Sequence, residues 1–365
     1  MAIGMGQFSP KELNFILGQF SIAPKKYSLT PLNQGYINDT FVVWNQSVPV
    51  YLLQRINHEV FPDVEGLMGN ISRSLQFLAS NSYEPISLVP TATGHFFFTH
   101  TQKGQSYWRL FTFMNHSVAH DTTGNPKVAF GAGRIIAEFH TLLQRARPED
   151  FVEVIPGFHD LGLREKQFAA AISMGIPKRL TKAKASLEFA LKTMKILKER
   201  NTTDLPYRVC HNDTKLNNIL FSRETDLPLC LIDLDTLMKG FFQYDFGDAV
   251  RTIVNTALED ETDLDKIGFN KDLFKAFVQG LAAAPPFLTR PEIHSLPWGA
   301  VLMPFLHGIR ALTDYLNGDL YYKTSYESQN LDRSLSLFQF TSKAMDNLSF
   351  MENSVLHEMK SISFK

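Results

Sequence analysis

Residues 207–248 constrain the fold of this chain more tightly than any other stretch of its sequence. They contain two short apolar runs, Ile219-Leu220-Phe221 and Leu229-Cys230-Leu231-Ile232, and short apolar runs bounded by turn residues are typical of buried strands. Polar residues surround these runs: His211, Asn212, Asp213, Lys215, Asn217, Asn218, Asp233, Asp235, Asp245 and Asp248. Carboxylates and amides at the ends of buried strands favour a site that holds a metal ion and a proton acceptor over a rigid hairpin.

The spacing of Asn218, Asp233 and Asp235 predicts a metal site. If the two apolar strands pair as a hairpin with residues 222–226 as its turn, Asn218 and Asp233 lie side by side at the open end. An amide oxygen and a carboxylate there suit Mg²⁺, which takes one or two protein oxygens together with substrate phosphates. Asp235 comes two positions after Asp233 and faces the same side, so the sequence leaves open whether it shares the metal.

The loop before this hairpin holds the candidate catalytic residues. Asp213 precedes Asn218 by five residues, and a carboxylate near bound phosphates that is not needed for the metal can accept the proton of an attacking hydroxyl. Lys215 is a candidate for neutralising a transferring phosphoryl group, although an exposed loop lysine explains it equally. We expect His211 to brace the loop by hydrogen bonding rather than to take part in chemistry.

The composition excludes several classes of function. The chain has 365 residues, 44% apolar and 20% charged, with a formal net charge of -1, so there is no basic field to bind nucleic acid or an anionic membrane. No apolar run approaches the ~20 residues of a membrane span, and the start of the chain lacks the pattern of a secretory signal. Two cysteines cannot form a disulfide framework, so a cytoplasmic location is the simplest expectation. Nothing in the sequence points to an obligate protein partner.

Hydrophobic periodicity divides the chain into two parts, and the composition shift near residues 112–117 is the expected boundary. Residues 1–112 should form mainly an antiparallel sheet with a helix on it, and residues 113–365 should be mainly helical. The first part combines helices and strands, with helices at 9–21 and about 63–80 and strands at 27–32, 40–43, 48–53, 88–90, 94–99 and 107–113. In the second part, the helices expected are 128–144, 167–174, 185–199, 249–258, 271–282, 298–316 and 332–347.

The form H-N-D-x-x-x-x-N at residues 211–218, with Asp233 after a buried strand, resembles the catalytic loop and metal strand of the protein-kinase-like superfamily. It is most similar to the branch of aminoglycoside phosphotransferases and choline kinases. The resemblance implies an α+β, bilobal protein-kinase-like fold with a small antiparallel β-sheet N-lobe and a larger helical C-lobe. The segment YDFG at residues 244–247 imitates a metal-binding motif, but no buried strand leads into it. Asp245 instead matches a later aspartate that braces the catalytic loop.

Within this branch, five segments together resemble N-acetylhexosamine 1-kinases: HNDTKLNNILF, CLIDLDTLMKG, YDFGDAVRT, LLQRINHEVF and RALTDYLNGDLYY. The resemblance implies ATP and Mg²⁺ as cofactors, Asp213 as the base for the sugar 1-hydroxyl, and Asn218 and Asp233 as the ligands of Mg²⁺. Arg310 and Tyr321 match positions that contact the hexosamine. Arg310 could instead pair with Asp314 one helical turn on, and Tyr321 could be a packed aromatic near a turn.

The nucleotide-binding residues depart from the pattern of the superfamily. A turn that contains Gly35, Asn38 and Thr40 could cover the ATP phosphates through its backbone, although an ordinary turn accounts for it nearly as well. The third strand lacks the lysine that holds the α- and β-phosphates, so Gln54 or Arg55 stands in or the contact is lost. The interlobe hinge at residues 111–115, which includes Phe113 and Asn115, could pair with adenine.

Three functions are compatible with these residues and with the resemblance that they carry. We expect an ATP-dependent sugar kinase that phosphorylates the anomeric 1-hydroxyl of N-acetylglucosamine or N-acetylgalactosamine. The alternatives are a kinase of the same fold that acts on another small hydroxyl substrate, such as an aminoglycoside, choline or an amino alcohol, and a non-catalytic nucleotide-binding protein. The missing strand lysine supports the last alternative. Neither the preferred hexosamine nor the oligomeric state can be derived from the sequence.

Overall fold

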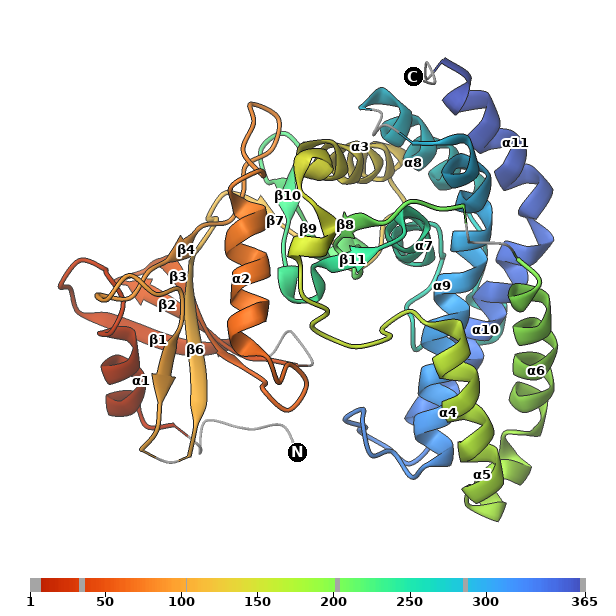
Figure 1. Cartoon of the computed structure of the whole chain (residues 1–365), viewed down its shortest axis with the longest axis horizontal. Helices are drawn as coiled ribbons and strands as arrows, with labels where there is room; N and C mark the ends of the chain where they lie inside the picture. The colour runs from red at the N-terminus through yellow and green to blue at the C-terminus, as the bar shows by residue number, and fades with distance from the viewer. Residues whose placement is uncertain (1–7, 33–36, 103, 201–203, 285–287, 362–365) are drawn as a thin grey trace.

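The computed structural model describes residues 8–32, 37–102, 104–200, 204–284 and 288–361. A β-sheet with one helix on each side, drawn in red and orange, lies beside a larger helical region that runs from yellow to blue (Figure 1). The predicted division between residues 112 and 113 stays a prediction, but the last strand of the sheet along the chain ends at Thr112.

The first region is an antiparallel sheet with the strand order β1-β2-β3-β6-β4, to which β5 adds by pairing with β6. The strands are β1 (Tyr27–Leu32), β2 (Asp39–Asn45), β3 (Val48–Ile56), β4 (Leu88–Val89), β5 (Phe98–His100) and β6 (Ser106–Thr112). Thr40 on β2 pairs in register with Gln54 on β3, and Gln54 pairs with Arg109 on β6. These three polar positions therefore form a row across the middle of the sheet.

The two faces of this sheet differ because successive side chains of a strand point to opposite sides. One face packs on α1 (Pro10–Leu17) through a buried apolar cluster that includes Val43, Leu53, Trp108 and Leu110. The opposite face carries the polar row and looks toward α2 (Val64–Leu75), as Figure 1 shows. The sheet thus has a dry side and a side with buried polar groups.

Residues 113–116 lead from β6 to the short strand β7 (Ser117–Val118), which belongs to a different sheet. There β7 pairs with β9 (Ile219–Ser222), and β9 pairs with β10 (Pro228–Leu231) as the predicted antiparallel hairpin. A separate two-stranded sheet joins β8 (Arg208–Cys210) to β11 (Met238–Gly240). The strands of residues 207–248 therefore belong to two small sheets. The residue after β8, His211, contacts the residue after β10, Ile232.

Helices surround these two small sheets: α3 (Pro126–Leu142), α4 (Leu161–Met174), α5 (Pro177–Lys182), α6 (Lys184–Lys198), α7 (Phe242–Ile253), α8 (Lys271–Ala283), α9 (Arg290–Leu316), α10 (Gln329–Asp346) and α11 (Leu348–Glu358). Helices α3 and α8 pack closely, with glycines of each facing the backbone of the other. A Cβ on Gly133 would lie 2.0 Å from the carbonyl oxygen of Phe277, and one on Gly280 would lie 1.9 Å from that of Phe130. The two helices approach to a distance that no larger residue allows at these positions.

Several elements differ from the prediction for physical reasons. Helix α7 begins at Phe242 rather than near residue 249. The prediction missed its first turns because acidic residues, which are also buried, interrupt the apolar stripe of Phe242, Phe246 and Val250. Helix α9 begins at Arg290, with a capping box formed by Thr289 and Glu292, and continues through two internal prolines. The elements α5, α11, β7 and β11 were not predicted.

The two cysteines, on β8 and β10, are free and buried in different sheets. Among the described residues, no helix combines the length and the apolar character needed to cross a membrane.

Candidate active site

Asp245 on α7 holds the loop that joins β8 to β9. Its two carboxylate oxygens accept hydrogen bonds from the backbone N–H groups of His211 (2.9 Å) and Asn212 (2.7 Å). The Nε2 atom of His140 on α3 lies 2.8 Å from the same carboxylate. Asp245 is fully buried, and these donors compensate its charge. The expectation that Asp245 braces the loop is confirmed by these contacts.

His211 ties this loop to the β9–β10 hairpin. Its Nδ1 atom accepts a hydrogen bond from the backbone N–H of Asp213 at 3.2 Å, and its Nε2 atom lies 2.9 Å from the carbonyl oxygen of Ile232. Because Nδ1 accepts, Nε2 carries the proton and donates it to that carbonyl. His211 is therefore a buried brace of the loop, as the sequence predicts.

Asp213 and Lys215 form an ion pair at the centre of the loop. The Oδ2 atom of Asp213 accepts hydrogen bonds from Nζ of Lys215 at 2.9 Å and from Nδ2 of Asn218 at 2.9 Å. Burial by itself would raise the pKa of Asp213, but the Lys215 ammonium outweighs it and the pKa is lowered. Burial would likewise lower the pKa of Lys215, but the carboxylates of Asp213 and Asp233 raise it. A carboxylate and an ammonium thus stand side by side, both charged at neutral pH.

Asn218 and Asp233 lie at the same end of the hairpin, where the sequence predicts them. Ile232, the residue before Asp233, donates its N–H to the carbonyl oxygen of Asn218 at 2.8 Å. The Nδ2 atom of Asn218 is engaged by Asp213, so its carbonyl oxygen is the end of the amide that can ligate a metal. Asp233 is exposed and has a left-handed backbone with φ 61°, a region that aspartate enters more readily than most residues.

The electrostatics of Asp233 fit a divalent cation. Desolvation by the surrounding protein, followed by the charge of Asp235, raises the pKa of Asp233 to about 6. A bound cation would reverse this shift, because it stabilises the ionised carboxylate. An amide oxygen and an exposed carboxylate at one strand end are the hard oxygen donors that Mg²⁺ takes, so the donor set fits the predicted metal.

Both carboxylate oxygens of Asp235 are already bound by protein groups. Arg109 on β6 donates from Nη1 to Oδ1 at 2.5 Å and from Nη2 to Oδ2 at 2.9 Å. Asn38, in the segment before β2, donates from Nδ2 to Oδ2 at 2.6 Å, and its own carbonyl oxygen accepts from the backbone of Asn57. Asp235 therefore faces the sheet and not the hairpin end.

The predicted nucleotide-binding residues of the sheet fall into three positions. Gly35 lies outside the described residues. Thr40 lies on the polar row, where its hydroxyl accepts a hydrogen bond from Gln54 at 3.0 Å. Arg55 lies on the opposite face from Gln54, where it pairs with Asp39 at 2.5 Å and stacks over the ring of Phe8. The structure thus separates Arg55 from the residues at the hairpin end.

The segment that connects β6 to β7 contains the predicted hinge residues Phe113 and Asn115. The backbone N–H of Phe113 is bound to the carbonyl of Val50 at 3.0 Å. Asn115 is exposed, and Ser117 closes a turn around it by hydrogen bonds from its backbone and hydroxyl to the carbonyl of Met114. A contact between adenine and this segment stays a prediction.

Arg310 and Tyr321 lie at the C-terminal part of α9 and in the loop that follows it. Asp314 accepts hydrogen bonds from the backbone N–H groups of Leu320, Tyr321 and Tyr322 and thereby shapes this loop. The guanidinium of Arg310 lies instead over the ring of Phe158, 4.9 Å from its centroid. Tyr321 is 56% exposed, so it is not the packed aromatic that the alternative interpretation expects.

Three arginines with specific partners were not predicted. Arg164 on α4 donates to the carbonyl oxygens of Gly157 and Phe158, and burial followed by the charge of Arg310 lowers its pKa to about 10. Arg251 pairs with the fully buried Asp248 at 2.6 Å, an i, i+3 spacing that the sequence displays. Arg109 could have been recognised as a charge inside an apolar strand, which must find a partner.

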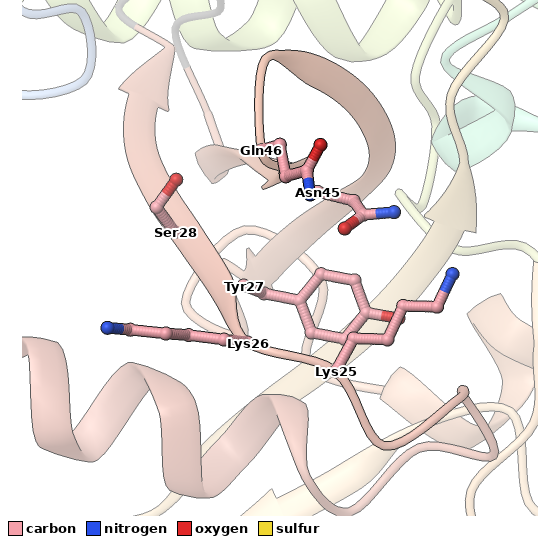
Figure 2. Close-up of a pocket in the computed structure, with 6 residues that line it drawn as sticks. All are labelled: Lys25, Lys26, Tyr27, Ser28, Asn45 and Gln46. Carbon is pink, nitrogen blue, oxygen red and sulfur yellow. The ribbon is translucent and has the colours of Figure 1, made fainter.

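A surface pocket of about 680 Å³ opens at the far edge of the sheet, away from these residues, and is lined by Lys25, Lys26, Tyr27, Ser28, Asn45 and Gln46. Figure 2 shows that the side chains of Lys25 and Lys26 extend in opposite directions. The two amines therefore do not converge on one anion, and the pocket is not part of the candidate active site.

Comparison with known proteins agrees with this geometry. Residues 28–287 match the family described as "Phosphotransferase enzyme family". A microcompartment-associated aminopropanol kinase superposes with a TM-score of 0.64 at 17% identity, over 94% of this chain and 99% of that one. An amicoumacin kinase in complex with AMP-PNP, Ca²⁺ and Ami gives a TM-score of 0.58 at 12% identity, over 93% and 94%.

An aminoglycoside phosphotransferase from Alicyclobacillus acidocaldarius subsp. acidocaldarius DSM 446 gives a TM-score of 0.60 at 12% identity, over 97% of this chain and 99% of that one. At these identities the likeness concerns the fold. The predicted α+β kinase-like fold, with an antiparallel sheet beside a helical region, is confirmed.

Proposed function

The chain belongs to the phosphotransferase enzyme family, and from this premise we propose that it is an ATP-dependent kinase that phosphorylates the anomeric 1-hydroxyl of N-acetylglucosamine or N-acetylgalactosamine. The set of Asp213, Lys215, Asn218 and Asp233 around one loop end supports phosphoryl transfer. The residues around Tyr321 support a neutral sugar as the acceptor. The product would be a hexosamine 1-phosphate.

The proposed mechanism assigns the proton transfer to Asp213. Its lowered pKa keeps it ionised, so it can orient the acceptor hydroxyl and take its proton as the hydroxyl oxygen bonds to the γ-phosphorus and the bond from that phosphorus to ADP breaks. The Lys215 ammonium, 2.9 Å from that carboxylate, can offset charge on the transferred phosphoryl group. Asn218 and Asp233 would hold Mg²⁺, which supplies positive charge to the phosphate oxygens. Catalysis by such a set is mainly positioning and charge neutralisation.

One observation supports a sugar rather than a cationic acceptor. The guanidinium of Arg310 is close enough to affect that of Arg164, since burial followed by the charge of Arg310 lowers the pKa of Arg164. Tyr322 and Tyr321 are also close enough to affect Arg164, and they raise its pKa. An ammonium substrate would meet two like charges in this corner, whereas hydroxyl and amide oxygens of an N-acetylhexosamine are acceptors for both guanidiniums.

The second candidate is a kinase for an amino alcohol or another small hydroxyl substrate. The structural similarity to an aminopropanol kinase favours it, and a cationic acceptor would need an acidic pocket. Asp314 near the end of α9 and Asp319 in the loop after it are acidic, but Asp314 is bound by backbone donors and Asp319 pairs with Arg179 at 2.6 Å. A non-catalytic nucleotide-binding role is less favoured, because the Asp213, Asn218 and Asp233 set is intact.

A substrate panel tests the proposal. Purified protein is assayed for ATP consumption with N-acetylglucosamine, N-acetylgalactosamine, 1-amino-2-propanol, choline and an aminoglycoside, each with Mg²⁺. The proposal expects turnover with a hexosamine, and phosphorus NMR of the product should show phosphate on the anomeric carbon. Turnover with the amines alone would support the second candidate, and no turnover with any acceptor, despite Mg²⁺-dependent ATP binding, would contradict both.

A further inference from the structure

The sheet carries its buried cation on β6 rather than on β3. On β3, Gln54 occupies the face that looks toward α2, and Arg55 points to the opposite face. Arg109 stands beside Gln54 on the neighbouring strand and is 1% exposed. Its Nη1 atom lies 4.0 Å from the sulfur of Met68 on α2. A guanidinium so deeply buried must be neutralised by a specific partner.

That partner lies in the other region of the molecule. Arg109 binds Asp235 with two nitrogens, at 2.5 and 2.9 Å, and Asp235 is 3% exposed. The Nε atom of Arg109 donates to Gln54 at 3.0 Å, and Gln54 in turn donates to Thr40 at 3.0 Å. Asn38 completes the network through its 2.6 Å bond to Asp235. Two segments of the sheet region thus bind one carboxylate directly, and Gln54 and Thr40 join the network through Arg109.

Asp235 belongs to the same turn as Asp233. The short helix of residues Leu234–Thr236 follows Asp233 directly, and its hydroxyl at Thr236 donates to the carbonyl of His211 at 2.8 Å. One side of this turn is therefore fixed to the catalytic loop and the other side to the sheet. Asp233 sits at the start of this turn, with its carboxylate exposed and its backbone left-handed.

We propose that Arg109 and Asp235 form a clamp between the sheet and this turn, and that the clamp positions Asp233 for the Mg²⁺–nucleotide complex. The inference rests on the proposed nucleotide-binding function and deepens it. Arg109 is a positioning residue that acts through Asp235. The clamp also fixes the position of the sheet relative to the hairpin end. Strand β3 cannot do this, because its residue on that face is the uncharged Gln54 and Arg55 points to the opposite face.

Geometry favours positioning over a role in stability alone. A buried ion pair often contributes little net stability, because desolvation offsets the attraction between its charges. Its bidentate form, however, restricts the orientation of both side chains. Partners that orient metal ligands without touching the metal typically change metal affinity by about 10- to 100-fold when removed.

The test compares Arg109→Met and Asp235→Asn in the full-length protein. Binding of a fluorescent ATP analogue is titrated with Mg²⁺, and the Mg²⁺ concentration at half-maximal binding is measured. The clamp predicts that both variants need about 10- to 100-fold more Mg²⁺. A simple field effect predicts opposite signs, since loss of the Arg109 cation should strengthen and loss of the Asp235 anion should weaken cation binding. Opposite signs, or no change, would overturn the proposal.

The double variant Arg109→Met/Asp235→Leu separates positioning from folding. Replacing both charges by apolar groups should restore much of the thermal stability lost in the single variants, while the Mg²⁺ requirement stays raised. Recovery of both properties would mean that the pair is only structural. Arg179→Met serves as the matched control, because it breaks an ion pair with Asp319 at 2.6 Å that joins α5 to the loop after α9, outside the two small sheets and the turn, and its Mg²⁺ requirement should match that of the unmodified protein.

The same experiment distinguishes the clamp from the proposed function. If the unmodified protein binds no nucleotide in the presence of Mg²⁺, the proposed function fails and the clamp fails with it. If the unmodified protein binds nucleotide and the two single variants bind it equally well, only the clamp fails. Which acceptor the enzyme phosphorylates does not affect this readout.

Discussion

The Nδ2 atom of Asn218 donates a 2.9 Å hydrogen bond to the carboxylate of Asp213, so the candidate metal ligand holds the candidate base directly. The same nitrogen also binds the backbone carbonyl of Asp213 at 2.8 Å. Removal of the metal ligand would therefore also release the base. The proposed chemistry depends on this small unit, and the following predictions separate its parts.

Replacing Asp213 by asparagine should lower turnover by about 10²- to 10⁴-fold, the usual contribution of a positioned base. The amide keeps the shape of the side chain and an oxygen for Lys215, so the fold and nucleotide binding should persist. Steady-state kinetics and nucleotide binding measure the two effects. Asp226→Asn is the control, because this residue lies in the turn at the other end of the hairpin with a φ of 56° that asparagine tolerates. Full turnover by Asp213→Asn would refute its role as the base.

The affinity for Mg²⁺ should decrease as the pH is lowered through about 6, because the pKa of Asp233 is raised to about 6. The sign follows from the charge: above this pH the carboxylate is ionised and binds Mg²⁺, whereas below it a proton competes for the same oxygens. Each further unit of pH should cost about tenfold in affinity. Binding of an ATP analogue between pH 5 and 8, with and without Mg²⁺, provides the measurement.

Two nearby histidines should not contribute to this pH dependence. Burial followed by the charge of Arg251 lowers the pKa of His307 to about 4, and burial followed by the charge of His307 lowers the pKa of His159 to about 3. Asp233→Asn should bind Mg²⁺ weakly and without the step near pH 6. A step that persists in this variant would assign the titration to another group.

Replacing Asp245 by asparagine should destabilise the protein by about 3 kcal/mol, the usual cost of breaking a buried charged network. One carboxylate oxygen would become an amide group that faces an N–H donor of His211 or Asn212, both of which are buried. Denaturant unfolding gives the free energy, and turnover should fall with it because the loop loses its brace. The exposed Asp260→Asn should stay within about 0.5 kcal/mol of the unmodified protein.

Replacing Arg310 by methionine should raise the KM for the hexosamine by about 10- to 100-fold, since a hydrogen bond from a charged group contributes about 1.5–3 kcal/mol. The KM for ATP should not change, because Arg310 contacts Phe158 and lies before the loop of Tyr321, away from the proposed metal ligands Asn218 and Asp233. The exposed Arg145→Met is the control. Unchanged KM for the sugar would remove Arg310 from the acceptor site, and improved turnover of an amino alcohol would favour the second candidate function.

Much of the fold could be predicted because its signals are local. Ser9 caps α1 as expected, by accepting a hydrogen bond from Glu12 at 3.2 Å, and the β9–β10 hairpin pairs with the expected ends. Helix α7 was predicted to begin too late, because the buried Asp245 and Asp248 look like loop residues until their partners are known. Short strands such as β7 and β11 carry too few residues for a periodic signal.

The sequence by itself determined the arrangement of the loop at residues 211–218 and its proximity to Asp233, since strand pairing and turn residues act over short separations. Only the tertiary structure decided what Asp235 does: its partner Arg109 is 126 residues away, on a strand whose position depends on packing of the whole sheet. The same holds for Arg310, which lies over Phe158 rather than beside Asp314. A buried charge must find a partner, but the choice of that partner is made by the packing of distant segments, which no local pattern encodes.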